Sequence, residues 1–127
     1  MGLNLTITPQ NEYIDVKVSG IATYASAIHL WQSIAQTCEE QQCFKVLGEQ
    51  SVKNSLSTME AWNHQKIFEE AGITSKFKIA WVDTNPHTYD TTNFIRTVLR
   101  NRDIAYGKLF SDITIAKDWL LDISKQN

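Results

Sequence analysis

Five polar side chains able to take part in chemistry stand just after predicted strands. They are Glu49, Asp83, His87, Tyr89 and Asp112, and the loops after parallel strands gather at the sheet edge where ligands usually bind. Hydrolysis or metal binding would need a histidine with a nucleophile, or with two further ligands, at fixed geometry. These residues lack such spacing, and turn or cap chemistry explains Asp83, His87 and Asp112. The sequence therefore predicts no enzyme, no metal site and no cofactor.

A second group of such residues lies in a predicted helix over residues 57–71. Leu56, Ile67 and Ala71 define the centre of its buried side, and Glu60 and His64 point the same way at about 100° per residue. One interpretation is a capping carboxylate that is hydrogen-bonded to the imidazole. The other is a polar pair that lines a cavity beneath the helix.

The pattern places some large apolar side chains in the core and others at the surface. Trp62 projects outward with Met59 beside it, which indicates a contact surface for a membrane or a protein, unless Trp62 folds back over a loop. Trp31, Trp81 and Trp119 fall on faces that should be internal. We therefore expect Trp62 to be at least partly exposed while Trp31 and Trp81 are buried.

Charge and cysteine content exclude several classes of protein. The 127 residues carry a net charge of −2, which offers no electrostatic footprint for nucleic acid. Arg96 and Arg100 share the outer face of a predicted helix, where we expect them to be solvated, and no glycine-rich phosphate loop accompanies them. Cys38 and Cys43 have neither metal-ligand nor redox spacing. With no signal peptide and no apolar run of membrane-spanning length, the protein is expected to be soluble and cytoplasmic.

The periodicity of the chain predicts an α/β fold. Strands alternating with helices favour parallel pairing with right-handed crossovers. We therefore expect one domain over residues 1–127, with a small, mixed, mostly parallel sheet of about five strands and helices on both faces. The predicted elements are a hairpin over residues 3–20, strands at 44–47, 77–82 and 105–110, helices at 22–42, 57–71 and about 94–103, and a last helix with the stripe Ile115, Ala116, Trp119, Leu120 and Ile123.

The chain resembles the SpoIIAA-like proteins, relatives of the STAS domain, and in particular their stand-alone bacterial branch. The residues that carry the resemblance are Gly20, the stretches 56–60, 98–102 and 110–112, Ala116 and the pair 119–120. That branch is similar in fold to lipid-carrying CRAL-TRIO modules. The resemblance implies a non-enzymatic protein that binds a nonpolar molecule, a membrane surface or a protein partner.

Ser57 occupies the position at which true anti-sigma-factor antagonists are phosphorylated. Those proteins carry an Asp-Ser-Ser-Gly-like run there, whereas residues 49–57 of this chain lack it. Ser57 and Glu60 instead match a capping box, in which each side chain accepts a hydrogen bond from the other residue's backbone N–H. The sequence therefore predicts a structural cap rather than a phosphorylation switch.

The sequence is consistent with two functions. The first is a carrier of a small nonpolar ligand that also docks reversibly on membranes, with the helix over residues 57–71 as a movable cover. Its expected ligand or membrane contacts are Leu56, Met59, Trp62, His64, Phe68 and Trp81. The second is a STAS-type protein–protein interaction module that resembles an anti-sigma-factor antagonist but lacks a functional phosphorylation motif, with Ser57 as the candidate phosphorylation site and a regulatory protein as the partner. Neither function specifies an oligomeric state. A closed apolar cavity beneath residues 57–71 favours the carrier, and a solid core with an exposed apolar patch favours the protein partner.

Overall fold

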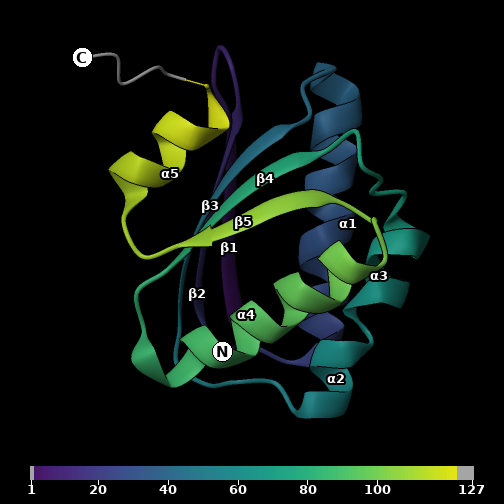
Figure 1. Cartoon of the computed structure of the whole chain (residues 1–127), viewed down its shortest axis with the longest axis vertical. Coiled ribbons are helices and arrows are strands. Elements are labelled where there is room, and N and C mark those ends of the chain that lie inside the picture. Colours follow the sequence, from purple (N-terminus) through teal and green to yellow (C-terminus); the bar gives the residue numbers. More distant parts are fainter. Residues whose placement is uncertain (1, 123–127) are drawn as a thin grey trace.

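The computed structural model describes residues 2–122 as one five-stranded sheet with helices on both faces (Figure 1). The strands lie in the order β1 to β5, with β1 antiparallel to β2 and all other neighbours parallel. This confirms the predicted α/β class and the opening hairpin. The strands are β1 (Leu3–Pro9), β2 (Ile14–Gly20), β3 (Lys45–Val52), β4 (Lys78–Asp83) and β5 (Tyr106–Phe110), and the helices are α1 (Tyr24–Gln41), α2 (Thr58–Trp62), α3 (His64–Ala71), α4 (Pro86–Asn101) and α5 (Ile113–Leu120).

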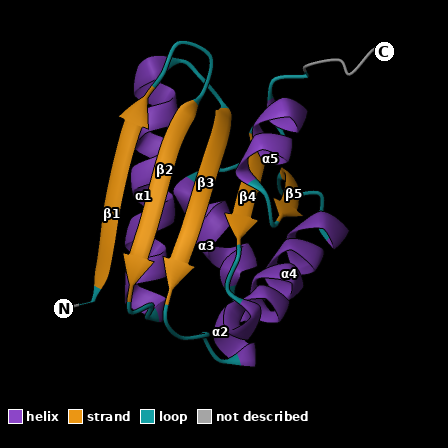
Figure 2. Ribbon diagram, turned by 90° about the vertical axis from the view of Figure 1, so that its left-hand side faces the viewer, coloured by secondary structure: helices purple, strands orange, loops and turns teal. Residues whose placement is uncertain are grey.

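Two hydrophobic cores lie on opposite faces of the sheet. Figure 2 shows α5 on one side and α1 and α3 on the other. The larger core is built on the side of α1, α3 and α4, whereas the smaller core lies between α5 and strands β3 to β5. Every residue of β4 from Ile79 to Asp83 is buried, because helices cover this strand on both faces.

Residues 57–71 form two short helices, so the prediction of one continuous helix is wrong. The Ser57 hydroxyl accepts from the N–H of Glu60 at 3.1 Å and the Glu60 carboxylate accepts from the N–H of Ser57 at 3.0 Å, so the capping box is confirmed. At Asn63, however, ψ is 0°, and the chain leaves α2 and starts α3. The break gives the two short helices different partners, since α2 packs on α4 and α3 packs on α1.

Two further boundaries differ from the prediction. Strand β3 continues through Gly48 to Val52, because β4 pairs with it as far as Gln50 and β2 pairs with it as far as Val52. Helix α4 begins at Pro86, within the expected loop. The Asn85 side chain caps it by accepting from the N–H of His87, and proline suits the first helical position since it needs no N–H there.

The last helix buries fewer of its predicted stripe residues than expected. Ala116 and Leu120 are fully buried, but Ile115 is 58% exposed and Trp119 is only half-buried. Trp119 lies edge-on to Tyr106, with ring centroids 5.3 Å apart. Helix α5 is the only described helix on its face of the sheet, so nothing in residues 2–122 covers its outer side. The predicted Ile123 lies outside the described residues.

Candidate ligand cavity

A cavity of about 130 Å³ lies between the sheet and helices α1, α3 and α4. Residues from β2 to β5 form its floor, and loop residues around Leu56 close one end. Most of its lining is apolar. The large apolar side chains of this lining are Leu3, Leu30, Trp31, Leu56, Phe68, Ile79, Trp81, Ile95, Leu99 and Leu109.

Three aromatic side chains form one wall of the cavity. Trp31 contacts Phe68 with ring centroids 4.5 Å apart and Trp81 with centroids 4.9 Å apart. The Trp81 ring lies over Gly48, its direct partner in the pairing of β3 and β4. The indole N–H of Trp81 donates to Gln50 Oε1 at 2.8 Å. Trp81 is therefore fixed by packing on one side and by a hydrogen bond at its polar edge.

A buried carboxylate organises the polar end of this wall. Asp83, the last residue of β4, is fully buried. Its oxygens accept from Thr88 Oγ1 at 2.8 and 3.0 Å, Thr92 Oγ1 at 2.9 Å, the Asn85 N–H at 3.0 Å and Gln50 Nε2 at 3.2 Å. Four hydrogen-bonding groups thus satisfy one buried charge without a cation. Asp83 is more than the turn residue that the sequence suggested, since it ties β3, β4 and α4 together.

His64 contributes a single polar ring to the cavity wall. It is 3% exposed, and its Nδ1 donates to the backbone carbonyl of Glu60 at 2.9 Å, because a carbonyl can only accept. The expected bond to the Glu60 carboxylate is absent, since that group caps Ser57 instead. Burial lowers the pKa of His64, so the ring is neutral at pH 7. Its Nε2 is then an acceptor.

The structure divides the six predicted contact residues into two sets. Leu56, His64, Phe68 and Trp81 line the cavity. Met59 and Trp62 lie outside it on α2, at 68% and 42% exposure. The guanidinium of Arg102 lies 5.6 Å from the centroid of the Trp62 ring, a cation–π distance. Trp31 and Trp81 are each 7% exposed, so the predicted contrast with Trp62 is confirmed.

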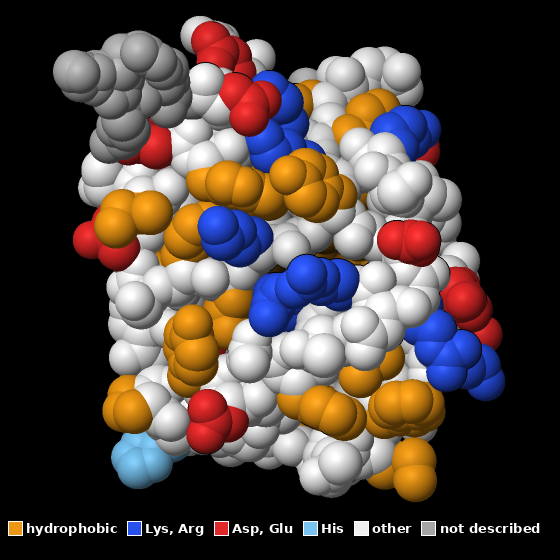
Figure 3. All heavy atoms as spheres, in the orientation of Figure 1, with side chains coloured by type: hydrophobic (Ala, Val, Ile, Leu, Met, Phe, Trp, Pro, Cys, Tyr) orange, Lys and Arg blue, Asp and Glu red, His pale blue; other side chains and the backbone are white. Residues whose placement is uncertain are grey.

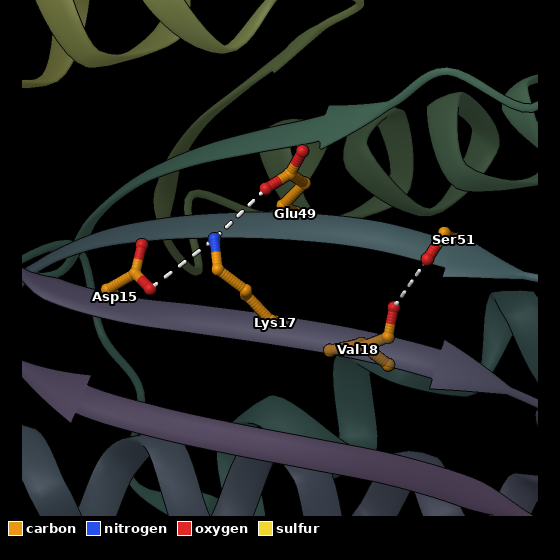
Figure 4. Close-up of polar contacts among 5 residues, drawn as sticks. All are labelled: Asp15, Lys17, Val18, Glu49 and Ser51. Carbon is orange, nitrogen blue, oxygen red and sulfur yellow. Dashed lines mark hydrogen bonds and ion pairs between the residues drawn. The ribbon is translucent and has the colours of Figure 1, made fainter.

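The other candidate polar residues do not meet in one site. Asp112 caps α5 by accepting from the Ile115 N–H, and the His87 side chain is exposed. Glu49 lies on β3, where its carboxylate accepts from Lys17 Nζ on the neighbouring strand β2 at 3.1 Å (Figure 4). This hydrogen bond raises the pKa of Lys17, with Asp15 at 3.7 Å also contributing. Within residues 2–122 no three His, Cys, Asp or Glu side chains are placed to share a metal ion.

Sequence reasoning missed Gln50, Thr88 and Thr92, which complete the Asp83 network. Thr88 and Thr92 are one helical turn apart on α4, so their shared side could be read from their spacing once α4 is known to start at Pro86.

The Cys38 thiol is unreactive, because burial raises its pKa to about 12. None of the helices in the described residues has the length and apolar character needed to cross a membrane.

This arrangement defines a small α/β protein with one mainly apolar cavity beside its sheet. A similar solved structure is that of an uncharacterized DUF3478 family protein with a SpoIIAA-like fold from Shewanella loihica PV-4. The two share 17% sequence identity and a TM-score of 0.53, over 94% of this chain and 93% of that one. The fold is therefore SpoIIAA-like. No family model matches the sequence, and no curated protein matches it either.

Proposed function

We propose that this protein is a non-enzymatic carrier of a small nonpolar molecule that acts in the cytoplasm. The cavity beside Trp81 and Phe68 supports this proposal, because its lining is mainly apolar with a few polar groups, as is usual for small-molecule sites. Its volume of about 130 Å³ is close to that of a cavity of roughly 150 Å³ that is known to bind benzene. The ligand therefore has an apolar part of about six carbon atoms.

Toluene is a neutral probe for this cavity. We expect saturating toluene to raise the Tm of the purified protein, since a ligand that binds only the folded state stabilises it. Ala27 lies on α1 in the cavity wall, so Ala27→Leu should fill the space and abolish the shift. Ile95→Phe serves as a second filling variant in case the first unfolds.

The control is Ala25→Leu, which adds the same atoms to an exposed position of α1 and should keep the shift. Native mass spectrometry of the untreated protein provides a second measurement, by detecting a co-purified small hydrophobic molecule. If toluene leaves the Tm unchanged and no such molecule is found, the carrier function is wrong.

The proposed carrier docks reversibly on membranes through Met59 and Trp62. The segment that acts as the movable cover of the cavity is α2, not all of residues 57–71. Helix α3 is anchored, because Ile67, Phe68 and His64 are all at most 3% exposed. Helix α2 buries only Ala61. The break at Asn63 lets α2 move while α3 stays in place, and segments with few buried contacts are those that open most readily.

Phosphatidylcholine vesicles test this docking. We expect the Trp62 emission to shift to shorter wavelength on binding, and the partition coefficient to fall at least tenfold in Trp62→Ser, since burying one such side chain is worth roughly 1.5–3 kcal/mol. Ile115→Ser, which removes an even more exposed apolar side chain on α5, should have a smaller effect. If vesicles leave the emission unchanged, Met59 and Trp62 are better explained as the contact surface of a protein partner, the STAS-type alternative.

A further inference from the structure

We propose that Arg96 and Arg100 form an anion-binding subsite at the mouth of the cavity, and that the ligand is a small carboxylic acid. This inference rests on the proposed carrier function and specifies its ligand. Helix α4 places Thr92, Arg96 and Arg100 four residues apart along one side, and all three line the cavity. Ile95 and Leu99 supply the apolar contacts beside them.

The cavity reaches the protein surface at several places, and the cations Arg100 and Lys108 are among its exposed lining residues. Arg100 is exposed and Arg96 is half-buried, whereas Leu99 between them is 7% exposed. Strand β5 is the edge of the sheet and borders the cavity beside α4. In Figure 3 a group of Lys and Arg side chains lies at the centre of the face that carries α4 and β5, next to a hollow with hydrophobic side chains in its depth.

Neither arginine has a counter-ion within the described part of the chain. The ion pairs of residues 2–122 all involve lysines, and no carboxylate lies within 4 Å of Arg96 or Arg100. Arg96 donates one hydrogen bond, from Nε to Asn93 Oδ1 at 3.2 Å. The helix dipole accounts for a cation at Arg100 in the last turn, but not for Arg96 in the middle of α4.

A carboxylate fits this geometry better than a neutral polar group. Guanidinium groups bind carboxylates through paired, charge-assisted hydrogen bonds. The neighbouring Thr92 hydroxyl cannot take that role, because it already donates to Asp83. Since the cavity holds an apolar group of about six carbons, hexanoate is a suitable representative of the ligand class.

Calorimetric titration with hexanoate, 1-hexanol and acetate tests the subsite. Hexanoate and 1-hexanol share a six-carbon chain and differ in charge, while acetate has the carboxylate without the chain. We expect the native protein to bind hexanoate at least tenfold more tightly than either of the others, because charge-assisted and apolar contacts both contribute. The double variant Arg96→Gln, Arg100→Gln should lose the preference for hexanoate and keep its affinity for 1-hexanol.

Arg102→Gln is the matched control, because Arg102 lies over Trp62 and outside the cavity lining. It should leave all three affinities unchanged. Equal affinities for hexanoate and 1-hexanol in the native protein, or a preference that survives the double variant, would overturn the anion subsite alone. Acetate binding as tightly as hexanoate would reduce it to a surface anion site unrelated to the cavity. If neither six-carbon compound binds, the carrier function fails together with the subsite.

Discussion

Replacing Gly48 by Ala is expected to lower the free energy of unfolding by about 1–3 kcal/mol, the usual range for overpacking a dense core. A methyl group at this position would overlap the six-membered ring of Trp81. The ring cannot move away at little cost, because it is 7% exposed, packs on Trp31 and donates to Gln50. Urea unfolding followed by circular dichroism would show the effect as a lower transition midpoint.

Gly107→Ala is the control for Gly48→Ala. Gly107 also lies in a strand beside the cavity, but an added methyl group there would meet Ile79 only at ordinary contact distances of 3.6 Å and more. We expect it to leave stability unchanged or slightly higher. In a Trp81→Leu background, Gly48→Ala should lose most of its cost, because the overlapping ring is gone. An undiminished cost there would show that the ring is not the cause.

The pairing of Gly48 with Trp81 illustrates what the sequence could and could not predict. Alternation and helical periodicity located the hairpin, the buried strand β4 and the order of elements, since those signals are local. The register between β3 and β4 is not local. It brings Gly48 beneath Trp81 and Gln50 opposite Asp83, and neither contact follows from the spacing of these residues along the chain.

The helical wheel was incomplete for Arg96 and Arg100 and wrong at Asn63, for related reasons. Arg96 and Arg100 were expected on the solvated outer side of their helix, and Arg100 is indeed exposed, but both also line the cavity beside the last strand of the sheet. Asn63 continued the periodic pattern of residues 57–71. Only the packing of the flanking helices on α4 and α1 reveals that the chain turns there. Both differences arise from tertiary contacts that periodicity does not contain.

Asp83→Ala is expected to cost about 3 kcal/mol or more, the largest stability effect predicted for this protein. Hydrogen bonds to a charged group are worth about 1.5–3 kcal/mol each, and buried donors left without a partner add a further penalty. The substitution would remove the acceptor from Gln50, Thr88 and Thr92 at once. It would also loosen Trp81, because Gln50 holds the indole N–H. Chemical unfolding would measure the loss of free energy.

Asp83→Asn removes the negative charge but keeps an oxygen that can accept hydrogen bonds, so it separates the contributions of the two to stability. The amide oxygen keeps an acceptor for the Asn85 N–H, and both threonine hydroxyls have backbone carbonyls within reach, Asn85 O for Thr88 at 3.3 Å and Thr88 O for Thr92 at 3.1 Å. The network can therefore rearrange, and we expect a loss of only about 1 kcal/mol. Asp15→Ala is the surface control, at under about 1 kcal/mol, because its partner Lys17 is largely exposed. If Asp83→Ala costs no more than Asp15→Ala, the carboxylate does not hold β3, β4 and α4 together, and the rigidity of the cavity wall must come from aromatic packing alone.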